Sequence, residues 1–243
     1  MNFAPYTAFF LFPVMVVLLE AGRALRRRRA AESSSAVEGA VFALFGLLLA
    51  FTFSGAISRY DEHKKLVTEE ANDIGTAYLR LSLLPADAQP ELRRLFQEYV
   101  DSRLHIYDAV GDAVSPETVR LQNTIWHESL AAASGSGANA DATKLLLPAI
   151  NEMIDITSTR ANVFRMHPPV VVFLLLYAFS GIAAFMAGYG MKAGERDWVY
   201  TVIFAAVVTL TVYATLEIEY PRQGLIRLTG LDQEMVALRD SMQ

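Results

Sequence analysis

The sequence predicts an all-α integral membrane protein, with four transmembrane helices and an extramembrane helical bundle between the second and third spans. Hydrophobic residues make up 53% of the 243 positions, and they gather in four long uncharged runs. A run of roughly 20 apolar residues matches the hydrocarbon core of a bilayer. The predicted parts are 1–58 with the first two spans, 59–167 with the extramembrane domain, 168–217 with the last two spans, and 218–243 as a tail with an amphipathic helix.

The first span is expected within residues 1–19, which are uncharged and are followed by Glu20 and then by five arginines. A signal peptide would carry its positive charge before the apolar stretch, so this order predicts a transmembrane helix. Glu20 and Glu38 lie at the ends of the first two spans, where a carboxylate is costly unless it is paired. Pairing with Arg23 or Arg26 is one interpretation, and a proton or ion relay is the other.

The second span and the segment after it are expected to form one long helix. Residues 39–58 are uncharged, and no strong turn signal follows before Pro85. The helix therefore crosses the membrane and continues into water as a stalk. The charged continuation keeps a helical apolar repeat, which consists of Leu66, Ala71, Ile74, Ala77 and Leu81.

Three further helices complete the predicted bundle. One spans 91–110 with an apolar face, one begins at Pro116 with Ser115 as its N-cap, and one spans 141–165. Short connections between these helices and the stalk indicate a bundle that stands on the membrane. The expected buried residues of the middle helix are Ile125, Trp126 and Leu130.

Spans three and four are expected at 168–191 and 198–216, joined by a short loop that requires an antiparallel return. Glu217 and Glu219 at the end of the fourth span are expected at the membrane interface, with Arg222 in reach. Span three is rich in small residues that allow close helix contacts, namely Gly181, Ala183, Ala184, Gly188 and Gly190.

The distribution of basic residues predicts the orientation. The first connecting loop carries the five arginines and the second carries Lys192 and Arg196, whereas the N-terminal tail has no basic side chain. Short basic loops stay in the cytoplasm. Basic residues also lie near the span ends on the domain side, but a long domain can cross the membrane despite its charge. The termini and the extramembrane domain are therefore expected on the non-cytoplasmic side of the cell inner membrane.

The composition argues against several classes of function. There are no cysteines, the net charge is −5, and the basic residues form a single cluster, so neither thiol chemistry nor nucleic-acid binding is indicated. The four histidines are His63, His105, His127 and His167, and none pairs with another at metal-ligand spacing. We therefore expect no catalytic residue, no metal and no cofactor, and an intramembrane enzyme would need a polar cluster that the spans lack.

The stalk contains a dense polar segment, with Glu69, Asn72, Asp73 and Thr76 as the candidate vestibule residues and Glu70 among them. Acidic side chains can select or concentrate ions when several copies face a common axis. A solvated helix face is the simpler interpretation for most of this segment, because charged neighbours three or four residues apart pair along a helix.

The second span shows two patterns along its length. Ala43, Leu47 and Phe51 recur every four residues, so in a symmetric oligomer they would stack as rings around an axis, and apolar rings of this kind gate by dewetting. The simpler interpretation is that Leu47 and Phe51 face lipid or the other spans. The second pattern is a face of small residues, suited to a helix contact or a narrow lumen, and consists of Gly39, Ala43, Gly46, Ala50 and Ser54.

The segment from Leu49 to Leu66 resembles the second-helix signature of bestrophins. Phe51, Arg59, Tyr60, Glu62 and Leu66 match that signature in the same register without a gap. More broadly, the runs EEANDIGTAYLRLSLLP and YPRQGLIRL resemble the bacterial proteins called bestrophin-like across nearly the whole length.

The resemblance implies a function for the second helix, because bestrophins are pentameric chloride-permeable channels in which this helix lines the pore. It places Phe51, Leu47 and Ala43 at the neck, with Thr52 and Ser54 beside them as pore-lining residues. Thr52 and Asp61 depart from the bestrophin pattern, which has a basic residue and a second aromatic there. The bestrophin domain is also cytoplasmic, opposite to the side that the charge count favours here.

Two functions therefore remain open at this point. One is a homo-oligomeric, anion-permeable ion channel, pentameric by analogy, whose partners are its own copies, the lipid bilayer and inorganic ions. The alternative is a non-conducting membrane sensor or scaffold whose helical domain binds a partner.

Overall fold

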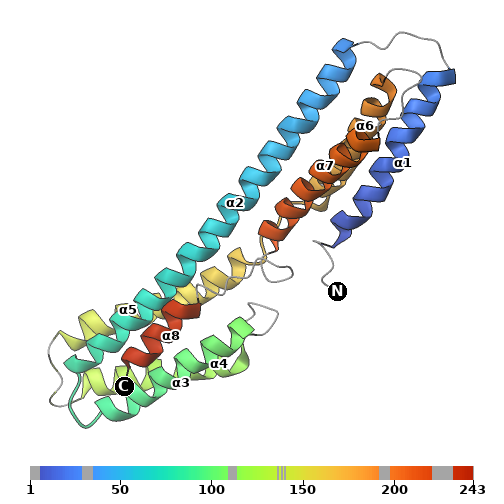
Figure 1. Cartoon of the computed structure of the whole chain (residues 1–243). Helices are drawn as coiled ribbons and strands as arrows, with labels where there is room; N and C mark the ends of the chain where they lie inside the picture. The colour runs from blue at the N-terminus through green and yellow to red at the C-terminus, as the bar shows by residue number, and fades with distance from the viewer. Residues whose placement is uncertain are drawn as a thin grey trace. The chain divides into compact units, whose positions relative to one another are not determined.

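A computed structural model of the chain describes residues 6–28, 35–108, 114–135, 137, 139, 141–191, 198–220 and 232–242, and within this part it contains helices and no strand. The predicted all-α fold class is confirmed (Figure 1). The described residues form two compact units, one within Met1–Tyr60 and His167–Arg227 and the other within Asp61–Met166 and Leu228–Gln243. The elements are α1 (Thr7–Arg28), α2 (Ser35–Arg80), a 3₁₀ turn (Leu81–Leu83), α3 (Gln89–Asp108), α4 (Pro116–Ser134), α5 (Ala142–Val163), α6 (Val170–Gly190), α7 (Trp198–Glu219) and α8 (Asp232–Ser241).

Helix α2 is the long helix that the sequence predicts. It runs for 46 residues without a break and ends in the 3₁₀ turn before Pro85. It contributes its first part to one unit and its later part to the other. The later part uses its predicted apolar repeat for packing, since Leu66, Ile74 and Leu81 are buried. Continuous hydrophobic periodicity, with no helix breaker inside it, explains why one helix serves both units.

The first unit contains α1, α6, α7 and the beginning of α2. Each of these four helices has the length and apolar character needed to cross a bilayer. Helix α1 packs on α6 and α7, and two glycines allow the α1–α6 approach. A Cβ atom on Gly188 would lie 1.8 Å from the backbone oxygen of Leu19, and one on Gly22 would lie 2.1 Å from that of Phe185. The small residues predicted in the third span therefore do bring helices close together.

The second unit is a helical bundle made of α3, α4, α5, α8 and the later part of α2. Helix α4 begins as predicted, because the Ser115 hydroxyl accepts a hydrogen bond from the backbone N–H of Thr118. Its buried face differs from the prediction. Ile125 is buried, but Leu130 is 38% exposed and Trp126 is only half-buried, while Ser129 is fully buried. The helical period places the smaller Ser129, rather than Leu130, opposite the other helices.

Helix α8 belongs to this bundle, which its weak sequence pattern did not reveal. The Arg239 guanidinium donates two hydrogen bonds to the Asp101 carboxylate, at 2.6 and 3.0 Å. The Tyr78 hydroxyl and the Gln97 amide both donate to the backbone oxygen of Met242, at 3.0 and 2.6 Å. These contacts attach the tail helix to α2 and α3.

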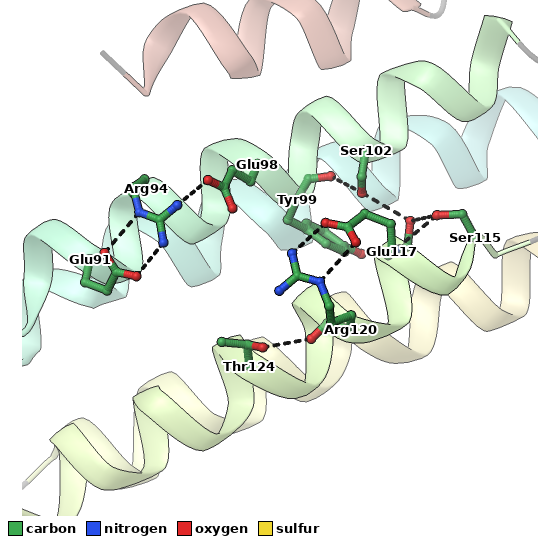
Figure 2. Close-up of polar contacts among 10 residues, drawn as sticks. Glu91, Arg94, Glu98, Tyr99, Ser102, Ser115, Glu117, Arg120 and Thr124 are labelled. Atoms are coloured by element: carbon green, nitrogen blue, oxygen red, sulfur yellow. Dashed lines mark hydrogen bonds and ion pairs between the residues drawn. The ribbon is translucent and has the colours of Figure 1, made fainter.

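The charged side chains on the outer faces of α3 and α4 pair within their own helices. Figure 2 shows Arg94 between Glu91 and Glu98 on α3, and Arg120 beside Glu117 on α4. All five side chains are more than 40% exposed. Exposed pairs of this kind contribute little to stability. These faces are solvated helix surfaces whose charges pair within one helix.

Candidate functional site

The membrane part of α2 is the least covered transmembrane segment within its own chain. Only 11% of its apolar window is buried, compared with 33% for α1, 33% for α6 and 39% for α7. Of the predicted pore-lining residues, Leu47 is 53% exposed and Phe51 68% exposed, and Ala43 and Ser54 are exposed as well. The structure thus brings four of these five residues onto the uncovered surface of one helix.

Thr52 differs from the other candidates. It is half-buried, and its hydroxyl donates to the backbone oxygens of Leu48 and Leu49, each at 2.9 Å. Its donor is therefore satisfied by the preceding turn of its own helix. Thr52 lies next to Phe51 along the chain and so about 100° away around the helix.

Two glycines of α2 differ from the glycines at the α1–α6 contact. Cβ atoms added at Gly39 and Gly46 would meet nothing within 4 Å, although both lie in the membrane part of the helix. At Gly22 and Gly188, in contrast, an added Cβ would overlap backbone atoms of the neighbouring helix. Small residues in a membrane helix normally serve a close contact. Within the described part of the chain, Gly39 and Gly46 have no such contact.

The candidate vestibule residues lie on the extramembrane part of α2. Glu69 and Asn72 are exposed, and Asp73 and Thr76 are half-buried. Partial burial, together with the negative charges of Glu69, Glu152 and Glu70, raises the pKa of Asp73 above its ordinary value. The structure thus gathers acidic groups around Asp73.

Glu70 has a different role from its neighbours, which corrects the interpretation of this segment as a solvated face. Its side chain is fully buried and accepts hydrogen bonds from Arg103, at 2.5 Å, and from Arg160. Burial opposes ionisation of the carboxyl, but the two guanidiniums outweigh it, so the pKa of Glu70 lies below its ordinary value. The ion cluster joins α2, α3 and α5 inside the second unit.

A second polar group lies in the same core. The Tyr99 hydroxyl hydrogen-bonds with the Thr157 hydroxyl at 2.8 Å and accepts from the Gln122 amide at 3.3 Å. Complete burial, with the nearby charge of Glu70, raises the pKa of Tyr99 to about 12. The hydroxyl therefore stays protonated, and the group acts as a structural crosslink between α3, α4 and α5.

The middle of α2 and the end of α7 are joined by an ion pair that sequence reasoning missed. Arg59 donates from Nε to both carboxylate oxygens of Glu219, at 2.9 Å each, and from Nη2 at 2.6 Å. His167 Nδ1 lies 3.3 Å from Oε1 of the same carboxylate. Glu219 was expected to pair with Arg222, which lies outside the described residues. Arg59 and Glu219 each follow a predicted span on the domain side. Their similar depth in the membrane was the sequence signal from which the ion pair could have been predicted.

The opposite ends of the spans are held by the arginines after the first span. Arg23 pairs with Glu20 at 3.3 Å, as predicted. Arg26 donates to the backbone oxygen of Tyr189 at 3.4 Å and lies over its ring. Glu38 does not share in these pairs, and its buried Oε1 has no hydrogen-bond partner within the described part of the chain. Lys192 and Arg196 of the second loop lie outside the described residues.

The described residues hold no group of three histidine, aspartate or glutamate side chains that could bind a metal ion. His63 is buried against the ring of Phe164, with the ring centroids 4.0 Å apart. His167 belongs to the Glu219 cluster. The ion pairs of the first unit described above therefore lie at the ends of the membrane spans. The exposed surface of α2 within its span consists mainly of apolar and small side chains.

Comparison with known proteins identifies the family of this chain. A model of the Bestrophin-like domain matches residues 7–230 of the chain. The chain belongs to the Bestrophin-like domain family. This confirms the resemblance seen in the sequence, and the family together with the four spans makes the protein a multi-pass membrane protein.

Solved structures show the same fold as this Bestrophin-like domain. Two crystal structures of a bacterial bestrophin homolog from Klebsiella pneumoniae, each carrying one substitution, align with TM-scores of 0.75 and 0.73. Both are 13% identical to the chain, and the alignments cover 99% and 96% of it and 99% of each homolog. At this identity the likeness is one of fold. No curated protein matches the chain.

Proposed function

We propose that this Bestrophin-like protein is a homo-oligomeric ion channel, pentameric and anion-permeable like bestrophins, in which α2 lines the permeation path. The observation that carries the proposal is the uncovered face of α2, where the Cβ positions of Gly39 and Gly46 meet no atom within 4 Å in the described part of the chain. A lipid-facing helix has no need of such small residues. A helix that meets other copies around a common axis does.

Along α2 the exposed face changes character at the end of the membrane segment. Glu69 and Asn72 follow Phe51 and Ser54 by 18 residues, which is about five turns of an α-helix, so each pair shares one side of α2. We therefore assign Ala43, Leu47 and Phe51 to an apolar neck, with Ser54 beyond it and Thr52 at its flank. Glu69, Asn72, Asp73 and Thr76 are assigned to a vestibule.

Flux through reconstituted protein tests this proposal. Liposomes that contain the purified oligomer are expected to show ion flux, and Phe51→Ala is expected to raise it because an apolar ring is the barrier to water and ions. Leu210→Ala on α7 is the matched control, since Leu210 is 59% exposed but lies on another helix. Absence of flux from a stable oligomer, or equal flux from the wild type and Phe51→Ala, contradicts the neck assignment.

Selectivity needs its own measurement, because the acidic groups around Asp73 favour cations rather than anions. Reversal potentials in a chloride gradient are expected to show chloride permeation. The double substitution Glu69→Gln with Asp73→Asn is expected to increase the chloride share of the current. A cation-selective current that becomes non-selective in this variant would refute anion permeability but would still support an ion channel.

A further inference from the structure

A cavity in the first unit lies next to the proposed neck but is built from three helices of one chain. It has a volume of about 200 Å³. Helix α2, the start of α6 with Pro168 before it, and the end of α7 all contribute. Its lining residues are apolar apart from two threonines and an ion pair at one end, and they include Leu48, Phe51, Val172, Phe173, Arg59 and Glu219.

The two threonines do not present their hydroxyl donors to the cavity. Thr52 donates to the backbone oxygens of Leu48 and Leu49, and Thr215 donates to that of Thr211 at 2.8 Å. The polar end therefore consists of the Arg59 and Glu219 cluster. An apolar space that ends in one charged group has the form of a site for an amphiphile.

The cluster presents its basic groups outward. The Glu219 side chain is 1% exposed, whereas that of Arg59 is 33% exposed and that of His167 36% exposed. Arg59 uses Nε and Nη2 for Glu219, and its Nη1 donates no hydrogen bond within the part of the chain that the structure describes. Gly55 leaves room for this end of the guanidinium, because a Cβ there would lie 3.3 Å from Nη1.

We propose that this cavity binds an anionic phospholipid, with part of an acyl chain along α2, α6 and α7 and the headgroup phosphate accepting hydrogen bonds from Arg59 Nη1. The placement follows from the chain itself, since Arg59 and Glu219 lie at the domain-side ends of their membrane spans, at the level of lipid headgroups, and the apolar lining lies within the spans. Arginine is suited to phosphate because its donors form a planar fork. The carboxylate of Glu219 is covered, whereas a third of the Arg59 side chain is accessible, so the charged group that a ligand meets is the cation.

Native mass spectrometry of the detergent-solubilised protein, titrated with phosphatidylglycerol or phosphatidylcholine, tests the proposal. Both lipids offer a phosphate, but the choline ammonium of phosphatidylcholine offsets its charge, so the exposed Arg59 cation predicts a preference for phosphatidylglycerol of about tenfold. The double substitution Arg59→Gln with Glu219→Gln is expected to abolish the preference. It removes both charges together, so no buried carboxylate is left without its partner. Glu219→Gln alone keeps the Arg59 charge and is expected to keep or increase the preference.

The acyl-chain half of the site has its own pair of variants on α6. Val172→Trp fills the cavity and is expected to reduce binding of both lipids. Ile182→Trp is the matched control, because it fills a second cavity of about 380 Å³ between α1 and α6, which no charged side chain lines. Phe51 is left unchanged, so that an effect on the proposed neck is not mistaken for one on lipid binding.

Four results would overturn the proposal. The first is an unchanged preference in the double glutamine variant. The second is equal loss of lipid in Val172→Trp and Ile182→Trp. The third is a changed number of subunits in Val172→Trp, which would show that a second copy of the chain covers the cavity. Displacement of the lipid by inorganic phosphate alone would also exclude a role for the acyl chain.

Discussion

The α1–α6 contact allows a prediction whose size follows from the structure. A Cβ atom on Gly188 would lie 1.8 Å from the backbone oxygen, 2.7 Å from the carbonyl carbon and 2.9 Å from the Cα atom of Leu19. No rotamer change relieves this overlap, because all three atoms belong to the backbone. Gly188→Ala therefore forces the two helices apart.

The expected cost is the upper end of the overpacking range, about 3 kcal/mol. Alanine regains about 1 kcal/mol in helix propensity over glycine, so the net loss in the free energy of unfolding is about 2 kcal/mol. Gly181→Ala is the matched control on the same helix, since its Cβ would lie 3.0 Å from a terminal methyl group of the flexible Leu18 side chain. That methyl group can move, so the gain in helix propensity is kept and Gly181→Ala is expected to be at least as stable as the wild type.

Unfolding of the two variants by sodium dodecyl sulfate in mixed micelles, followed by circular dichroism, measures the difference. The account predicts that Gly188→Ala unfolds at clearly lower detergent fraction than the wild type and that Gly181→Ala does not. Wild-type stability of both variants would refute the close approach of α1 and α6. A similar loss in both would show that any added methyl group on α6 is harmful, whatever atoms it meets.

Three further predictions concern the second unit. Glu70→Gln is expected to lower the free energy of unfolding by about 3 kcal/mol, because it leaves the charges of Arg103 and Arg160 buried without their carboxylate. The lowered pKa of Glu70 stabilises the fold at pH values above the unfolded-state pKa, and this stability is lost as the pH falls through the native pKa. Acid unfolding followed by circular dichroism should therefore depend less on pH in the variant. Asp73→Asn is expected to raise the thermal unfolding temperature at pH 7, since a raised pKa means that the charged carboxylate is disfavoured in the folded state. No increase is expected at a pH low enough to protonate the carboxyl of the wild type. A lower unfolding temperature of the variant at pH 7 would contradict this. Ser115→Ala is expected to cost about 1 kcal/mol by removing the N-cap of α4, and Ser115→Asp should restore most of that loss in the same denaturation assay.

The features that the sequence could predict are those carried by a local signal. The four spans, the unbroken α2 and the Ser115 cap each follow from hydropathy, periodicity or a short motif in one segment. The uncovered face of α2 was also visible as a stripe of small residues. The structure adds that Gly39 and Gly46 of this stripe meet no neighbour at their Cβ positions within the described residues.

The features that escaped prediction depend on segments far apart in the chain. The pairs Arg59 with Glu219 and Arg239 with Asp101 join residues separated by more than 130 positions, at 160 and 138. Glu70 resembled its solvated neighbours because its two arginines come from α3 and α5. Leu130 was expected in the core because of its side chain, whereas the packing of α4 selected Ser129. In each case the partner, and not the residue itself, decides the role.

In the proposed channel, other copies of the chain cover the exposed face of α2 around a path open to water. The absence of cysteine from the sequence makes single-cysteine labelling with a charged, membrane-impermeant thiol reagent the most direct test. Leu47→Cys on α2 is compared with Leu174→Cys on α6, because both leucines are more than half exposed in the single chain. In proteoliposomes the account predicts that position 47 reacts and position 174 does not. Equal protection of the two positions from the reagent would place this face of α2 against lipid and contradict the claim.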